Sequence, residues 1–156
     1  MTTLQAHGIS CNLPSGFEGR IFQRTSVGGA VARPVAHFST FALPADVADF
    51  GAGAVNLMAP QDIFSSLFEY GPESLGTALF AQNGMPRQLA PQDFSTITLR
   101  RGVPSQSGTQ WFFTESGRPF TLYVVLGNHG LRNSLVPRVN ALLGNVDVSQ
   151  TGSTAP

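Results

Sequence analysis

The distribution of apolar side chains divides the first half of the chain into short strands. Residues 7–13 alternate between polar and apolar side chains, a Pro-Ser-Gly turn follows, and residues 17–24 continue the pattern, which predicts two strands joined by a turn. Residues 35–43 carry apolar groups on both faces, as expected of a strand covered on two sides. β-Branched and aromatic residues dominate residues 62–70 and predict a further strand, with a helix starting at Pro60 as the alternative.

Glycine and proline then interrupt the pattern. Three glycines and three prolines between residues 71 and 95 are spaced too closely for a long regular element. A folded-back excursion with a short helix near residues 73–82 is therefore expected. Loops of this length inside compact domains usually have a function or are disordered.

The strongest strand pattern lies in the last third of the chain. Residues 96–101 and 109–114 are predicted strands, and the almost continuously apolar residues 119–126 predict a central strand. The Glu-Ser-Gly-Arg sequence before this last strand is typical of a hairpin connection, because Gly117 can adopt the positive φ that short turns require.

A helical pattern follows the predicted central strand. Leucine and valine side chains recur at helical spacing from Leu131 to Leu143, and Gly144 provides a natural stop. Pro137 is compatible with this helix if Ser134 is the N-cap. Pro137 then occupies the third helical position, where an N–H group would have no partner within the helix.

Short strands followed by one helix predict the α+β class, with an antiparallel sheet flanked by helices. At 156 residues the chain has the size of one domain. We expect this domain to extend over residues 7–148, after a flexible N-terminus of residues 1–6. Residues 149–156 are polar and predict a disordered tail, because they bury too little apolar surface to offset the entropy of ordering.

All nine basic residues are arginines, and the chain has no lysine. This excludes enzymes that form a Schiff base on lysine and phosphate-binding loops that need one. A GC-rich genome is the alternative explanation for the arginine bias. Nine acidic residues balance the arginines and only 12% of the residues are charged, so neither nucleic acid nor an anionic membrane is an expected partner. The low net charge favours association with protein.

Cys11 is the only cysteine, which excludes an intrachain disulfide and a cysteine metal cluster. Its place on a short alternating segment indicates a small buried packing residue rather than a nucleophile. Residues 1–15 have no basic start followed by a long apolar run, and no stretch reaches the roughly 18 apolar residues of a membrane span. A cytoplasmic protein is therefore expected.

The three histidines lie far apart in the chain and lack a second ligand at metal-binding spacing, so no metal or cofactor is expected. His37, on an apolar strand, is expected to be a hydrogen-bonded core or rim residue. His129 lies in a glycine-flanked loop and is the best candidate base. A small hydrolase-type enzyme that uses His129 with Glu69 or Glu115, with the long segment after residue 70 as a lid, is one alternative function.

Aromatic and arginine residues gather around the predicted hairpin, where Trp111 is accompanied by Arg100, Arg101 and Arg118. Tryptophan and arginine frequently anchor protein contacts, because each buries a large area and offers directional donors. We therefore predict a noncatalytic binding or assembly module whose partner is another protein or a second copy of the chain, with Trp111 as the anchor. Two alternatives are that the rings fill the core, and that the chain is a structural subunit of a large phage-like bacterial assembly.

The two ends of the chain carry further short motifs. Residues 8–17 read Gly-Ile-Ser-Cys-Asn-Leu-Pro-Ser-Gly-Phe, and a long predicted strand at residues 120–127 leads into a helix at residues 135–143. The opening is similar to the strand-Pro-x-Gly-aromatic start of PsbP-like domains, and the ending resembles their last strand and C-terminal helix. The resemblance implies an α/β/α sandwich and a role in binding or assembly without catalysis.

Overall fold

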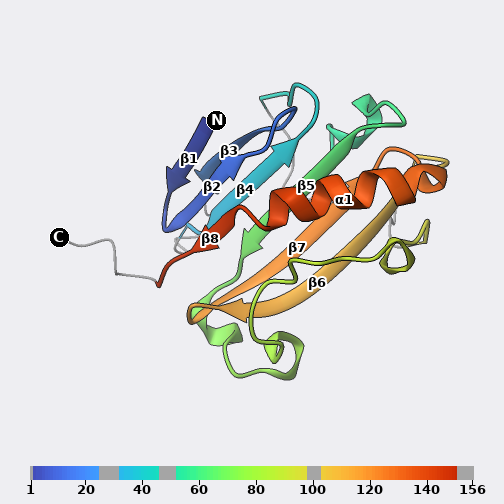
Figure 1. The fold of residues 1–156 in the computed structure, drawn as a ribbon. Helices are drawn as coiled ribbons and strands as arrows, with labels where there is room; N and C mark the ends of the chain where they lie inside the picture. Colours follow the sequence, from blue (N-terminus) through green and yellow to red (C-terminus); the bar gives the residue numbers. More distant parts are fainter. Residues whose placement is uncertain (1, 25–31, 46–51, 98–102, 151–156) are drawn as a thin grey trace.

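Two antiparallel sheets and one α-helix make up the part of the protein that the computed structural model describes, which is residues 2–24, 32–45, 52–97 and 103–150 (Figure 1). The strands are β1 (Thr2–Ala6), β2 (Ile9–Leu13), β3 (Glu18–Gln23), β4 (Pro34–Ser39), β5 (Ile63–Glu69), β6 (Ser107–Glu115), β7 (Arg118–Leu126) and β8 (Val146–Val148). The helix is α1 (Arg132–Leu143), and the 3-10 turns are η1 (Val55–Leu57), η2 (Pro72–Ser74), η3 (Ala78–Phe80), η4 (Pro91–Asp93) and η5 (His129–Leu131). These elements confirm the predicted α+β class.

The larger sheet has the strand order β3-β4-β5-β7-β6, and every neighbouring pair is antiparallel. β5 pairs with β7 along the whole length of β5, and both strands are buried almost throughout on both faces, which explains their nearly continuous apolar and small residues. The strand predicted in residues 62–70 is confirmed as β5, and the alternative helix from Pro60 is wrong. The strands predicted in residues 35–43, 109–114 and 119–126 are confirmed as β4, β6 and β7.

The first and last strands meet in the smaller sheet, whose order is β1-β2-β8. A two-residue turn joins β1 to β2, with φ of 52° at His7 and 77° at Gly8, as tight hairpins require. The sequence predicts a flexible N-terminus over residues 1–6, whereas the described part of it forms β1 because this turn folds it back onto β2. The predicted tail starts as ordered chain, since the Ser149 N–H donates to the Gly8 carbonyl (2.8 Å); residues 151–156 lie outside the described residues.

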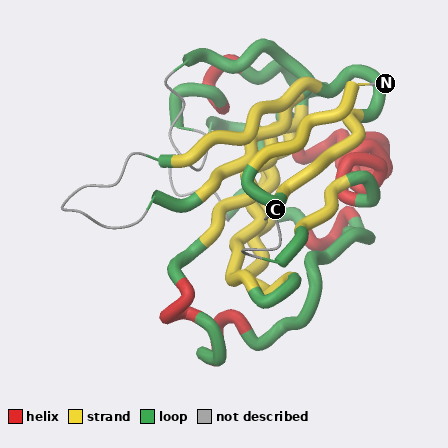
Figure 2. The backbone as a smooth tube through the Cα atoms, turned by 90° about the vertical axis from the view of Figure 1, so that its left-hand side faces the viewer, coloured by secondary structure: helices red, strands yellow, loops and turns green. Residues whose placement is uncertain are grey.

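The helix α1 lies across one face of the larger sheet (Figure 1), and the turned view shows it on one side of the strands (Figure 2). Gly144 ends it, as predicted. It begins earlier than predicted, because Arg132 is its first residue and η5 precedes it, with the Asn128 side chain accepting a backbone N–H bond two residues further on. Ser134 is therefore not the N-cap, and Pro137 is the sixth helical residue rather than the third. The buried residues of α1 are Leu135, Val136, Val139, Leu142 and Leu143.

The long segment between β5 and β6 packs against both the sheet and α1. It contains the turns η2, η3 and η4, and the first two of these replace the short helix predicted near residues 73–82. Its second half lies beside α1, where the Leu89 N–H donates to Asn140 Oδ1 (2.8 Å) and Asn140 Nδ2 donates to the Leu89 carbonyl (3.0 Å). Met85 and Phe94 in this half are buried in the main core. The segment is thus part of the packed fold.

The face of the larger sheet opposite α1, which we call the outer face, is covered by turns and loops where the structure describes it. Ala54, Phe64 and Val125 are fully buried on this face, and Phe41 packs against them. Within the described ranges α1 is the only α-helix, so the predicted flanking by helices is observed on one face. The strand predicted for residues 96–101 lies largely outside the described residues.

Candidate functional site

Arg118, which the sequence places on a partner-binding surface, is buried at the start of β7. Its side chain is 4% exposed and forms a double ion pair with Glu69 on β5 (Nη2 to Oε1 2.6 Å, Nε to Oε2 3.1 Å). Its other bonds go to backbone carbonyls, from Nη1 to Ser149 (3.0 Å) and from Nη2 to His7 (3.0 Å). The guanidinium also lies over the Phe120 ring, 5.2 Å from its centroid. These contacts use the donors inside the fold, so Arg118 does not belong to an exposed binding surface.

We call this arrangement the Arg118–Glu69 brace, because it joins the two sheets. β5 and β7 belong to the larger sheet, whereas His7 lies in the β1–β2 turn and Ser149 follows β8 of the smaller sheet. A buried charge is tolerated only when it is paired and hydrogen-bonded, and both conditions are met here. Gly8 beside the brace has a positive φ, and any side chain there would collide with the Arg118 guanidinium.

The residues of the predicted hydrolase site lie at opposite ends of the larger sheet. Glu69 is opposite Phe120 in the register, and His129 follows the far end of β7, so about 20 Å of strand separate Glu69 from His129 at the usual rise per residue. Glu115 is opposite Arg118, at the same end as Glu69. The expectation that His129 meets Glu69 or Glu115 is therefore wrong, because the antiparallel register holds them apart.

Glu115 and His129 each have a local role in the fold. Glu115 accepts a hydrogen bond from the Met85 N–H (3.0 Å) and lies 3.6 Å from the Arg87 guanidinium, which anchors the segment that runs beside α1. The His129 N–H donates to the Ser105 carbonyl (2.6 Å), which fixes the turn before α1. Among the described residues, no three His, Cys, Asp or Glu side chains lie close enough together to hold a metal ion.

Trp111 lies in the middle of β6 and faces the α1 side, where its half-buried ring packs against the main core. Its indole N–H is enclosed and has no hydrogen-bond partner in the described part of the chain. Phe113 is fully buried on the same face, so Trp111 and Phe113 contribute to the core, in agreement with the alternative that the rings fill the core. Arg100 and Arg101 lie outside the described residues, and the anchoring role of Trp111 stays a prediction.

The edge of β6 is open at its centre, and this feature was not found by sequence reasoning. Gly108 and Thr114 direct their backbone groups away from β7, because both bond to chain on the other side of β6. Backbone groups in an antiparallel strand point to the same edge at every second residue, so Gln110 and Phe112 also face outward. No described residue hydrogen-bonds to these outward N–H and C=O groups. In the described part of the chain, the outward backbone groups of two β6 residues thus have no hydrogen-bond partner.

Both ends of this open edge are closed by the chain itself. Ser95 exchanges two backbone hydrogen bonds with Gly108 (2.9 and 3.0 Å). At the other end the Thr114 N–H donates to the Gln82 carbonyl and its carbonyl accepts from Gly84, both at 2.8 Å. The result is a short window between two covered stretches, along the outermost strand of the larger sheet (Figure 1). We call it the β6 window.

A row of polar residues crosses the outer face of the larger sheet, one from each strand. In register order they are Arg20, His37, Ser66, Tyr123 and Gln110. His37 and Ser66 are fully buried, with the His37 imidazole edge-on to the rings of Phe22 and Phe64. Burial also raises the pKa of the Tyr123 hydroxyl above its ordinary value. His37 thus belongs to the core of this face, as the sequence predicts.

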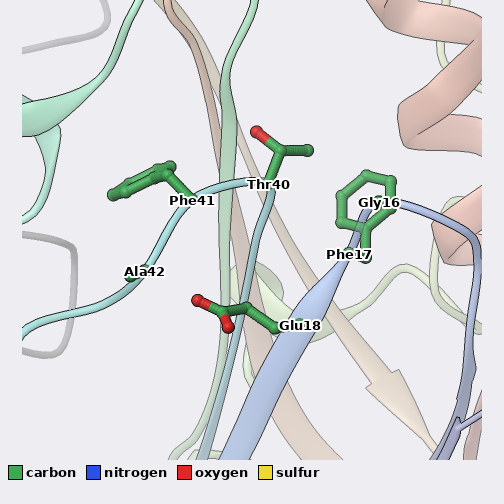
Figure 3. Close-up of a pocket in the computed structure, with 6 residues that line it drawn as sticks. All are labelled: Gly16, Phe17, Glu18, Thr40, Phe41 and Ala42. Carbon is green, nitrogen blue, oxygen red and sulfur yellow. The ribbon is translucent and has the colours of Figure 1, made fainter.

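A shallow depression of about 260 Å³ lies at the end of β3 and β4 (Figure 3). Glu18 is the one charged residue among those that line it. The Thr40 hydroxyl beside it already donates to Asp62 and accepts from the Ile63 N–H. In Figure 3 the Phe41 side chain extends away from Phe17, so the two rings do not enclose a ligand between them. The depression is therefore a weaker candidate site than the β6 window.

No protein-family model, no curated protein and no solved structure matches this chain. In the described ranges, no helix is long and apolar enough to cross a bilayer.

Cys11 is expected to be unreactive while the protein is folded. The thiol is buried on β2, and burial, with a smaller contribution from the Asp147 carboxylate, raises its pKa to about 11. Because the thiolate is the reactive form, only about one molecule in a thousand is ionised at pH 8. We expect alkylation by iodoacetamide at pH 8 to be about a hundredfold slower than in urea-unfolded protein, as measured by mass spectrometry. Equal rates in the two states would contradict the burial of Cys11.

Proposed function

We propose that the protein is a noncatalytic binding module that recognises a protein partner through the β6 window. The single observation that carries the proposal is the pair of outward-facing residues Gln110 and Phe112, whose backbone N–H and C=O groups have no partner in the described chain. Such an edge is a template for pairing with another extended chain. A three-residue segment placed opposite them in antiparallel register can form four backbone hydrogen bonds.

The closed ends of the window favour a flexible segment over a folded sheet edge as the occupant. Asn83 and Ser95 are bridged to β6 and occupy the position of the next strand on either side of the window. A second copy of β6 would bring its own covered stretches into the same plane and collide with them. A tail or linker of a partner protein can enter and leave the window by turning out of the sheet. Trp111 lies between the two open residues and remains the proposed anchor.

Neutral composition and the PsbP-like resemblance support the same kind of role. The chain carries no net charge, which gives little protection against association with other proteins. The resemblance of residues 8–17 and of the C-terminal strand and helix to PsbP-like domains implies binding without catalysis and adds the α/β/α sandwich to the proposal. The distance between His129 and the two glutamates supports the noncatalytic reading over the hydrolase alternative.

Blocking the window with proline is expected to weaken binding strongly without unfolding the protein. In Gln110→Pro the N–H that is lost faces outward, so the β6–β7 ladder keeps all its hydrogen bonds, as for prolines on natural edge strands. Peptides selected from a displayed random library against the unmodified protein should bind Gln110→Pro about tenfold to a hundredfold more weakly, because the pairing hydrogen bonds are lost. Fluorescence anisotropy with a labelled peptide measures this change.

Gln110→Ala is the matched control, because it removes the same side chain and keeps the backbone N–H. We expect it to bind the selected peptides with unchanged affinity, and thermal unfolding should show that both variants are folded. Equal binding to Gln110→Pro and to the unmodified protein would overturn the proposal. Light scattering of the same samples tests the alternatives of a homo-oligomer or a subunit of a large assembly, which predict a mass above that of one chain.

A further inference from the structure

An aromatic cluster lies beside the β6 window on the outer face of the sheet. It consists of Tyr70, Phe80 and Phe112, with ring centroids 5.1 Å apart for Tyr70 and Phe80 and 5.7 Å apart for Phe80 and Phe112. Phe80 is buried, whereas Phe112 and Tyr70 are half-buried. Leu79, on the same turn as Phe80, is 58% exposed. Apolar surface thus continues from the window onto η3.

The geometry of strand pairing brings an incoming side chain to this cluster. Residues directly opposite each other on antiparallel strands carry their side chains on the same face, with Cβ atoms about 4.5–5.5 Å apart. Phe112 faces outward with its backbone and places its ring on the outer face. A guest residue that pairs with Phe112 therefore projects its side chain next to the Phe112 ring.

Among the described residues, those that flank this position on β6 and β7 are uncharged, and the Arg24 guanidinium lies farther away, over the Phe68 ring of β5 beside Tyr70. Gln110, Thr114 and Thr121 are its neighbours on the outer face of β6 and β7. The ion pair of Arg87 with Glu115 involves the side chain of β6 that points to the α1 face. A guest carboxylate or ammonium at this position would therefore lose hydration without gaining an opposite charge from the described side chains that flank it on β6 and β7.

We infer that the β6 window selects a flexible, uncharged segment that presents a large apolar side chain to Phe112. The inference rests on the proposed function, because it names the chemistry of the same partner. An aromatic or branched aliphatic side chain extends the cluster of Tyr70, Phe80 and Phe112, and edge-to-face contact between rings adds to the area that the guest buries. Backbone pairing supplies the alignment, and this contact supplies the specificity.

The test compares two protein variants with two peptides. A peptide selected from the displayed library is made with its consensus apolar residue and with alanine at that position, and both are titrated against the unmodified protein and Phe112→Thr. We expect the alanine substitution to weaken binding to the unmodified protein about tenfold and to have little effect on binding to Phe112→Thr. Ile97→Ser, which removes an exposed side chain outside the cluster, should behave like the unmodified protein.

The outcomes separate this inference from the proposed function. Peptides that lose binding in Gln110→Pro but show no apolar preference, or no coupling to Phe112, would overturn the inference and leave the window as the binding site. Peptides that bind Gln110→Pro as well as the unmodified protein would overturn both. Thermal unfolding checks that Phe112→Thr is folded, and Phe112→Leu provides a second variant that keeps apolar bulk at the position and should retain most of the binding.

Discussion

Glu69→Gln is expected to lower the free energy of unfolding by about 3–5 kcal/mol, measured by urea denaturation, because it leaves the buried Arg118 guanidinium without its countercharge. The Glu69 carboxylate is almost fully buried and makes two hydrogen bonds to that guanidinium. Glutamine keeps the size of the side chain but carries no charge, and one of its two terminal atoms is a donor that faces another donor. For a small domain this loss is a large part of the total stability.

Two companion variants make this prediction specific. Glu73→Gln carries the same chemical change on an exposed side chain and should change stability by less than about 0.5 kcal/mol. The double variant Glu69→Leu/Arg118→Met replaces the pair by apolar residues and should recover much of the loss, because no unpaired charge is left. Equal midpoints for Glu69→Gln and Glu73→Gln would show that the brace does not stabilise the fold.

Phe120→Ala is expected to cost about 3–5 kcal/mol of unfolding free energy, because it opens a cavity in the main core. Phe120 is fully buried, stacks on Phe113 with ring centroids 5.9 Å apart, and lies beneath the Arg118 guanidinium. The substitution therefore removes packing and the cation–π contact together. Urea denaturation of purified protein measures the change.

If the alanine variant does not refold, the conservative variant Phe120→Leu allows the free energy of unfolding to be measured. This variant should be destabilised by a smaller amount. Ile97→Ala is the matched control, since its side chain is 88% exposed and it should change stability by less than about 0.5 kcal/mol. A loss below about 1 kcal/mol for Phe120→Ala would mean that the ring is not packed as described.

The strands that sequence reasoning located correctly are those with a strong local pattern. β7 is almost continuously apolar, and it is the second strand of a hairpin whose turn residue Gly117 has a φ of 74°. Local chemistry therefore determines both the strand and the turn before it. β1 carries only a weak pattern, and what holds it is the turn at His7 and its pairing with β2. The sequence predicts too late a start for α1, because Ser134 is of a residue type that commonly caps helices. In the structure Asn128 accepts the capping hydrogen bond instead, at the start of η5, which leads directly into α1.

The candidate site depends on contacts between distant residues, which local patterns do not contain. The sequence places Arg118 on a partner-binding surface because it lies near Trp111 at the hairpin and arginine frequently anchors protein contacts. It is buried because Glu69, 49 positions away in the chain, and two carbonyls from the ends of the domain meet it. Gln110 and Phe112 carry no signal of an open edge, since the order of strands decides which strand is outermost.

The pairing of β2 with both β1 and β8 has a consequence for biosynthesis. Residues 2–13 are made before the rest of the described domain, yet β2 can pair with β8 only after Val148 has left the ribosome. The Arg118 side chain likewise completes its hydrogen bonds only after Ser149, whose carbonyl accepts one of them, has been made. The β1–β2 hairpin therefore has to stay available for pairing until β8 is made, and the contacts between the two sheets are complete only after Ser149 has emerged.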